Sequence, residues 1–247
     1  GKFFPSDGRP RLLPVSWRPP AARTTRRYPF RLNTGRVRDQ WHTMTRTGQS
    51  PRLSAHLAEP FLEIHPKDTT ASGIHPSDLV EVSSPTGASI LRARITDAVQ
   101  KGQVFAPMHW TAETAPSARI DALIAAACDP VSGQPESKAG VVDLRRFDAG
   151  WYGFAIAQKP MHLTADYWAL ARTSHGFRAE LAGRLQPDDW EAEARRLFDA
   201  PTAVLTTIID ARRGSARIAA HADGVFLGAL FVSPTPVAIM RDYLVTL

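Results

Sequence analysis

The 247-residue chain contains a single cysteine, Cys128, and this scarcity excludes several classes of site at once. One thiol cannot form an internal disulfide framework or an all-cysteine metal or iron–sulfur centre. No apolar run reaches about 18 residues, so no transmembrane helix and no membrane partner are expected. The eight histidines show neither H-x-H nor H-x-x-x-H spacing, and no Gly-x-Ser-x-Gly or Walker-type loop occurs. The sequence therefore predicts no metal ligand, and it disfavours serine hydrolases and P-loop enzymes.

What the chain does contain indicates a turn-rich globular protein. Hydrophobic residues make up 43% of it, which is enough for one large domain or two small ones. Twenty prolines and 16 glycines argue against a helical bundle. The chain begins at Gly1 rather than at a methionine and stops within the apolar run 243–247, so we expect it to be a fragment of a longer polypeptide.

Basic residues are concentrated toward the N-terminus. The formal net charge is +6, but residues 1–52 alone contain twelve Lys or Arg and only two acidic residues, Asp7 and Asp39. Such a block favours an anionic partner such as phosphate, nucleic acid or an acidic surface. For residues 1–27, an extended proline-rich lead-in with solvated arginines explains the charge equally well. Aromatic residues do not interleave with these arginines, which disfavours a nucleic-acid partner.

Residues 28–147 are typical of a small β-barrel. Short runs with apolar residues at alternate positions are separated by turns rich in glycine and proline. Many short strands of this kind favour a barrel over a doubly wound parallel sheet. The predicted strands cover residues 28–32, 61–64, 79–82, 89–95, 103–106 and 141–144, and the first of them ends at the turn Asn33-Thr34-Gly35.

Beyond residue 147 the pattern changes to that of a small α+β unit, which we expect over residues 148–247. Asp188 or Asp189 is a candidate cap for a helix through residues 190–198, and Ala222-Asp223-Gly224 is typical of a hairpin turn. Residues 167–171 and 177–181 carry helical spacing, and strands are predicted at 203–210, 216–220 and 225–232.

The stretch from Tyr28 to Gln49, YPFRLNTGRVRDQWHTMTRTGQ, is chemically the most informative. A strand and an Asn-Thr-Gly turn precede a polar segment, an order that presents main-chain N–H groups to an anion. Threonine hydroxyls in this stretch, with Arg36, Arg38 and Arg46, suit phosphate oxygens. Trp41 and His42 add a flat surface for a heteroaromatic ring. The residues thus favour a phosphate-bearing heteroaromatic ligand, while a strand–turn–helix with a solvated basic face remains an equal alternative.

The pattern L-N-T-G-R-x-x-x-x-W-H-T-x-T-R-T-G closely resembles the C-terminal molybdopterin-dinucleotide-binding domain of the dimethyl-sulfoxide-reductase-like molybdenum oxidoreductases. Within that family it is most similar to the catalytic subunit of bacterial assimilatory nitrate reductases. Three further segments carry the same resemblance: the lead-in FFPSDGR at 3–9, VFAPMHW at 104–110, and CDPVSGQPESK at 128–138. The resemblance covers residues 1–147 in order, which makes it far more specific than one short motif.

The resemblance implies a six-stranded double-psi β-barrel, the aspartate-decarboxylase-like fold, followed by the α+β extension. It places His109 and Trp110 beside the substrate funnel. Asp121 stands where relatives often have asparagine, and an ionised carboxylate would repel phosphate. Of the cofactor contacts that the resemblance implies, the one at Asp121 therefore has the least support. The implied cofactor-binding residues are Asn33, Thr34, Gly35, Arg36, Gln40, Trp41, His42, Thr43, Asp121 and Lys138, with no catalytic residue in this chain.

The same resemblance implies a cytoplasmic enzyme that reduces nitrate to nitrite in nitrate assimilation. Its cofactor would be molybdenum bis(molybdopterin guanine dinucleotide). A [4Fe–4S] cluster, and a possible [2Fe–2S] module, would lie outside this chain together with the metal ligand, so the fragment alone should be inactive. The expected partners are the remaining domains of the same enzyme and an electron donor: ferredoxin, flavodoxin or an NADH-dependent reductase subunit. The alternatives are another molybdenum oxidoreductase, such as a formate dehydrogenase, and a binding barrel without redox chemistry.

Overall fold

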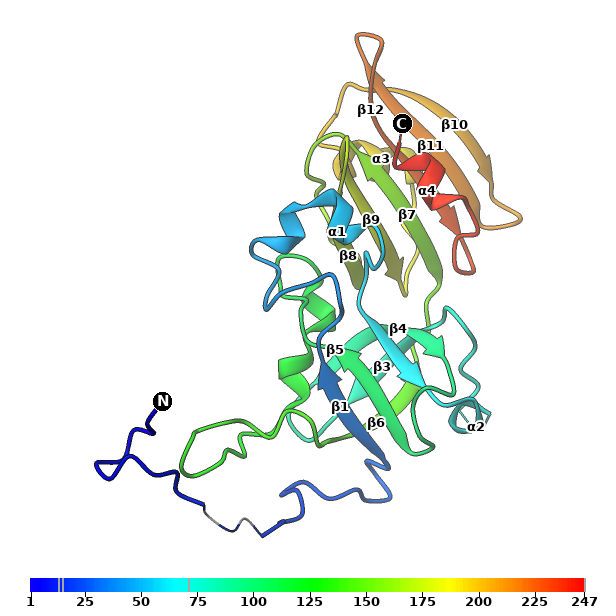
Figure 1. Cartoon of the computed structure of the whole chain (residues 1–247). Helices are drawn as coiled ribbons and strands as arrows, with labels where there is room; N and C mark the ends of the chain where they lie inside the picture. Colours follow the sequence, from blue (N-terminus) through cyan, green and yellow to red (C-terminus); the bar gives the residue numbers. More distant parts are fainter. Residues whose placement is uncertain (13, 15, 71, 247) are drawn as a thin grey trace.

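A computed structural model describes residues 1–12, 14, 16–70 and 72–246. Figure 1 shows a barrel, from which the N-terminal residues extend, and a separate sheet stacked on it that carries the C-terminus. The described part of residues 1–27 forms no helix or strand, in agreement with its many prolines. The main-chain N–H groups of Ala21 and Ala22 donate to the carboxylate of Glu136, at 3.0 and 3.4 Å. The end of the lead-in is therefore tied to the loop at 128–138.

The barrel is a closed ring of six strands in the order β1-β5-β2-β4-β3-β6. The pairs β1/β5 and β2/β4 are parallel, and the other neighbours run antiparallel. Fully buried aliphatic side chains such as Leu32, Leu62, Leu91 and Val104 fill its interior. The prediction of a mainly β protein with a six-stranded barrel is thus confirmed. The strands are β1 Phe30–Gly35, β2 Phe61–Ile64, β3 Leu79–Ser83, β4 Ala88–Ile95, β5 Gln103–Pro107 and β6 Gly140–Arg146.

The segments between the strands hold only short helices. Thr47–Gln49 and α1, Pro51–Ser54, follow β1, and α2, Pro66–Thr69, follows β2. The one-turn helices Pro116–Ala118 and Ile120–Leu123 follow β5.

The first strand ends later than the sequence predicts. Asn33, Thr34 and Gly35 continue β1 instead of forming a turn, because they pair with Phe105, Ala106 and Pro107 of β5. Gly35 is needed here for space, since a Cβ atom at this position would lie 2.7 Å from the Phe105 ring. The turn predicted at 33–35 is therefore wrong, and the chain leaves the strand only after Gly35.

Residues 148–246 form a six-stranded antiparallel sheet in the order β10-β11-β12-β7-β9-β8, with few helical residues. The helices predicted at 167–171 and 177–181 are wrong: both segments are strands, joined by a tight hairpin at Gly176. The helix predicted at 190–198 is confirmed as α3, and the Asp189 carboxylate caps it by accepting from two main-chain N–H groups. The elements are β7 Trp151–Ala157, β8 Tyr167–Thr173, β9 Gly176–Gly183, α3 Trp190–Leu197, β10 Val204–Asp210, β11 Ser215–Ala222, β12 Val225–Ser233 and α4 Arg241–Leu244.

This sheet lies between the barrel and α3. One face contributes Phe154 and Tyr167 to the same hydrophobic core as the barrel residues. The other face packs Leu181 and Ile218 against Leu197 of α3. Because side chains alternate between the faces of a strand, each face of the sheet buries its own set of apolar residues. The barrel and the C-terminal sheet are therefore joined by a continuous core.

Candidate functional site

The candidate site is built where β1 and β5 end side by side. These strands are parallel, so their carboxyl ends meet at one edge of the barrel. The loop at 36–43 leaves β1 there, and the segment 108–110 leaves β5. The main-chain N–H of Met108 donates to the carbonyl oxygen of Gly35 at 3.0 Å, which holds the two exits together.

Arg36, Trp41 and His42 gather on the exposed side of this loop. The guanidinium carbon of Arg36 lies 4.8 Å from the centre of the Trp41 ring, and the rings of Trp41 and His42 meet edge to face at 4.5 Å. Trp41 is 54% exposed, an unusual cost for so large an apolar side chain. Within the described residues Arg36 makes no side-chain hydrogen bond or ion pair, so its donors stay available. The cluster offers a charged donor next to an aromatic surface.

Two hydroxyl groups extend this cluster. The oxygens of Thr43 and Thr45 lie 3.1 Å apart, and both side chains are exposed. Arg38 is less available than Arg36, because its Nε donates to Asp39 at 2.9 Å. That hydrogen bond lowers the pKa of Asp39 below its ordinary value, and His56 contributes in the same direction. Among the described residues, the available donors here are thus the guanidinium of Arg36 and one threonine hydroxyl, since the other threonine hydroxyl donates to its neighbour.

Lys138 lies at the end of β1, beside Thr34. Its ammonium group donates to the carbonyl oxygen of Thr34 at 2.8 Å, and the Thr34 hydroxyl donates to the carbonyl oxygen of Ser137 at 2.7 Å. The structure therefore brings Lys138 to Thr34, although more than a hundred residues separate them in the chain. An ammonium group has three donors, so this contact leaves Lys138 further donors for a ligand. Its cofactor contact stays a prediction.

His109 is completely buried beneath the loop. Its Nε2 accepts from the main-chain N–H of Val37 at 2.9 Å, and its Nδ1 lies 2.7 Å from the carbonyl oxygen of His42. Because Nε2 accepts, the ring proton must be on Nδ1 and is donated to His42. Burial lowers the pKa of His109, and the charge of Arg36 adds to that effect. Both ring nitrogens are therefore used inside the protein, and a direct substrate contact would require one of these bonds to break.

Other predicted site residues have structural partners as well. Gln40 is 4% exposed; its amide donates to the carbonyl oxygen of Leu53 at 3.3 Å and accepts from the Thr47 hydroxyl at 2.7 Å. Trp110 is also buried. The Gln40 side chain thus ties the loop to the residues that follow it, a role that the sequence did not suggest. Asn33 is exposed on β1.

Asp121 is exposed on the helix Ile120–Leu123, and no contact of its side chain with the loop is seen among the described residues. The neighbouring carbonyl oxygen of Ala122 accepts from the hydroxyl of Thr86 at 3.0 Å, which ties this helix to the turn between β3 and β4. The structure therefore does not bring Asp121 to the Arg36 cluster, and its predicted cofactor contact stays untested.

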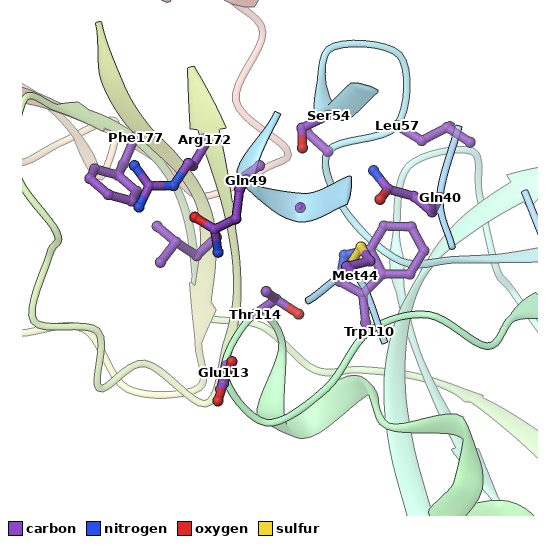
Figure 2. A pocket seen from close by; sticks show the side chains of 14 residues that line it. Gln40, Met44, Gln49, Ser54, Leu57, Trp110, Glu113, Thr114, Arg172 and Phe177 are labelled. Atoms are coloured by element: carbon purple, nitrogen blue, oxygen red, sulfur yellow. The ribbon is translucent and has the colours of Figure 1, made fainter. Parts of the chain in front are cut away.

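A cavity of about 150 Å³ lies behind the loop, between it and the C-terminal sheet. Figure 2 shows Gln40, Met44 and Trp110 on one side of this cavity and Arg172 and Phe177 on the other. The main-chain N–H of Leu170 donates to the carbonyl oxygen of Thr114 at 2.8 Å, so β8 closes the cavity. Sequence reasoning missed this wall because no local signal relates residues 170–177 to the loop.

The fold and the cluster together define a β-barrel suited to a ligand that carries phosphate and a heteroaromatic ring. Residues 30–141 match the family described as molydopterin dinucleotide binding domain. The chain is 40% identical over 193 residues to "Nitrate reductase" from Klebsiella oxytoca, which covers 78% of this chain and 22% of that protein. It is 34% identical over 123 residues to "Assimilatory nitrate reductase catalytic subunit" from Bacillus subtilis, covering 50% of this chain and 17% of the relative.

A third relative has a different name. The chain is 37% identical over 145 residues to "F420-dependent formate dehydrogenase subunit alpha" from Methanocaldococcus jannaschii, covering 59% of this chain and 21% of that protein. The chain thus spans about a fifth of the length of the curated relatives it matches. In the part of the chain that the structure describes, no helix is long and apolar enough to cross a bilayer.

The donor set fits a molybdopterin dinucleotide. Arg36 and the exposed hydroxyls of Thr43 and Thr45 suit the pyrophosphate, and Trp41 presents a ring face beside them. Across residues 1–12, 14, 16–70 and 72–246 no group of three His, Cys, Asp or Glu side chains is placed to hold a metal ion by itself. What the chain offers is a surface for the organic part of such a cofactor.

Proposed function

We propose that this chain binds one molybdopterin guanine dinucleotide of a molybdenum oxidoreductase that reduces nitrate to nitrite. The observation that carries this proposal is the Arg36–Trp41 stack, an exposed guanidinium and ring at the joined ends of β1 and β5. When bound, the cofactor supplies two-electron oxygen-atom transfer at molybdenum. The polypeptide supplies the binding and the orientation of the cofactor.

Each residue of the site has a definite task in this proposal. Arg36 donates charge-assisted hydrogen bonds to phosphate oxygens, and Thr43 adds a neutral donor. Trp41 and His42 cover a ring of the ligand. Lys138 offsets phosphate charge from the edge of β1, where its bond to Thr34 already holds the ammonium group in place. The positive groups of the loop also favour the approach of an anionic substrate.

Nitrate is favoured over formate as the substrate because relatives named nitrate reductase include the 40% identical protein from Klebsiella oxytoca. The formate dehydrogenase from Methanocaldococcus jannaschii keeps the alternative open. Reduced-viologen assays of the full-length protein, first with nitrate and then with formate, separate the two substrates. Turnover of formate but not nitrate overturns the nitrate assignment. A protein that contains neither pterin nor molybdenum is a binding barrel without redox chemistry.

The remaining parts of the proposal concern the whole enzyme. We place the metal ligand and a [4Fe–4S] cluster in domains other than this one, with a [2Fe–2S] module as a possible addition. The electron donor is a ferredoxin, a flavodoxin or an NADH-dependent reductase subunit, and the enzyme works in the cytoplasm. The chain by itself should therefore bind cofactor without reducing nitrate. A viologen assay of the isolated chain tests this, and activity there would contradict it.

The site itself is tested by nucleotide binding. Guanosine 5′-diphosphate (GDP) carries the pyrophosphate and guanine of the dinucleotide, and calorimetry measures its affinity for the chain. We expect Arg36→Ala to weaken GDP at least about tenfold, because a charge-assisted hydrogen bond contributes about 1.5–3 kcal/mol. Arg23→Ala is the matched control: it removes the same exposed charge from the lead-in and should change affinity less than about twofold. Equal losses in the two variants would count against the site.

A further inference from the structure

The buried side chain of His109 is hydrogen-bonded to both ends of the loop at 36–43. One ring nitrogen accepts from the main chain at Val37, and the other donates to the main chain at His42. The ring is completely buried, and Val37 and His42 flank the stretch that presents Trp41. Removal of this one side chain would therefore leave a part-buried N–H and a part-buried carbonyl without these partners, at both ends of the same loop.

The loop needs such a connection because its backbone is strained. His42 has φ 46° and Met44 has φ 61°, both in the left-handed region that residues other than glycine avoid. The strained residue His42 is the one whose carbonyl oxygen accepts from His109. A hydrogen bond from a rigid, buried ring holds this carbonyl in the direction that the strained conformation requires.

We propose that His109 is a positioning residue that holds the loop at 36–43 in its ligand-binding shape, and that it does so only as a neutral imidazole. The inference rests on the proposed function for the claim that this loop shape binds a ligand. The two hydrogen bonds from His109 to the loop are a property of the chain itself. His109 acts through Arg36 and Trp41, which the loop carries, and touches no ligand itself.

Protonation of His109 would break the connection at one end. A charged imidazole has a proton on both nitrogens, so Nε2 would face the N–H of Val37 with no acceptor between them. Burial disfavours the charged ring, and so does the charge of Arg36; His42 is the other titratable group that acts on it. We call the loop closed when both hydrogen bonds to His109 are formed and open when they are broken. The pKa of His109 is therefore lower in the closed loop than in the open one. The closed loop is fully favoured above the ordinary histidine pKa of about 6.5 and loses stability as the pH falls below that value.

Hydrogen exchange measured by mass spectrometry tests this inference without any ligand. Protection of the peptides that cover residues 36–44 is followed between pH 7.5 and 5 and corrected for the intrinsic exchange rate. In the unaltered chain we expect protection to fall by up to about tenfold per pH unit below pH 6.5. Peptides from β7 and β9 are the internal reference and should not follow this profile.

Three variants separate the pH effect from simple loss of packing. His109→Ala should lower protection of the loop about tenfold or more at pH 7.5. His109→Gln offers both an acceptor and a donor but does not titrate, so its profile should be flat between pH 7.5 and 5. His175→Ala, in the exposed hairpin between β8 and β9, is the matched control and should behave like the unaltered chain.

A flat profile in the unaltered chain overturns the inference, and so does a His109→Gln profile that falls like that of the unaltered chain. GDP titration of the same samples keeps the two proposals apart. Failure to bind GDP together with the expected exchange profile counts against the proposed function alone. GDP binding that stays tight at pH 5 in a chain with a flat profile counts against the role of His109 alone.

Discussion

A charged cluster at the junction between barrel and sheet gives the sharpest test of how the two units are joined. The carboxylate of Glu59, just before β2, accepts from Arg92 on β4 in three contacts of 3.1 to 3.2 Å, two from Nε and one from Nη2. It also accepts from the hydroxyl of Tyr167 on β8 at 2.8 Å. Tyr167 is completely buried, and the side chain of Arg92 is 12% exposed. The cluster therefore joins three elements in a nearly dry place.

Arg92 and Tyr167 are both donors to the carboxylate of Glu59, and their pKa values show that each keeps its proton. Burial by itself lowers the pKa of Arg92, but the charge and hydrogen bonds of Glu59, together with Tyr167 and Glu180, outweigh burial, and the net shift is upward. Burial raises the pKa of the Tyr167 hydroxyl well above its usual range, and the charge of Glu59 raises it further. Arg92 thus stays charged and Tyr167 stays a donor throughout the neutral range.

The perturbation is Glu59→Gln, which keeps the shape and removes the charge. Loss of one partner of a buried pair costs about 3–5 kcal/mol, and the 22% exposure of Glu59 places our expectation at the lower end, about 3 kcal/mol. With a urea dependence of about 2–3 kcal/mol/M, the midpoint of unfolding should fall by about 1 M. Urea titration followed by circular dichroism measures this directly.

The matched control is Glu63→Gln on β2. Glu63 lies 3.7 Å from Arg94, whose side chain is 56% exposed, so this change should cost less than about 1 kcal/mol. A double-mutant cycle of Glu59→Gln with Tyr167→Phe should give a coupling of at least about 0.5 kcal/mol. If Glu59→Gln shifts the midpoint no more than Glu63→Gln does, the cluster does not support the junction.

Three further outcomes can be measured. Gly183→Ala should lower the free energy of unfolding by about 1–3 kcal/mol in urea titration, because its Cβ would lie 2.5 Å from Nε1 of the buried Trp151. The control is Gly140→Ala, whose Cβ would have its nearest neighbour at 3.4 Å and which should change that free energy by less than about 0.5 kcal/mol. Asp189→Ala removes the cap of α3 and should cost about 1 kcal/mol, which equal melting temperatures would contradict. Lys138→Met should weaken GDP binding about tenfold in calorimetry while changing the free energy of unfolding by less than about 1 kcal/mol, since Lys138 is an exposed residue whose ammonium group donates to one carbonyl oxygen at the end of β1. Unchanged affinity would remove Lys138 from the site.

The sequence alone was sufficient where structure follows from neighbouring residues. Alternating apolar positions and Gly or Pro turns predicted the barrel strands, and Asp189 predicted the start of α3, because a cap and a strand face are local properties. The chemistry of the loop was equally visible, since hydroxyls, arginines and Trp41 lie within a few residues of one another. Local patterns failed at 167–181, where a short apolar run fits both the helical and the strand period. Pairing of β9 with β7, and of β8 with β9, made both segments strands.

Only the tertiary structure decided which of the polar residues are exposed at the candidate site and which are bonded inside the chain. Arg36 and Trp41 are exposed, whereas Gln40 and His109, which look equally suitable in the sequence, are buried with their polar atoms bonded inside the chain. The reason is physical: a buried polar group must find a partner, and the partner of His109 is a strained loop more than sixty residues away in the chain. The cluster of Glu59, Arg92 and Tyr167 depends in the same way on three distant elements, and no local sequence pattern encodes a contact of that kind.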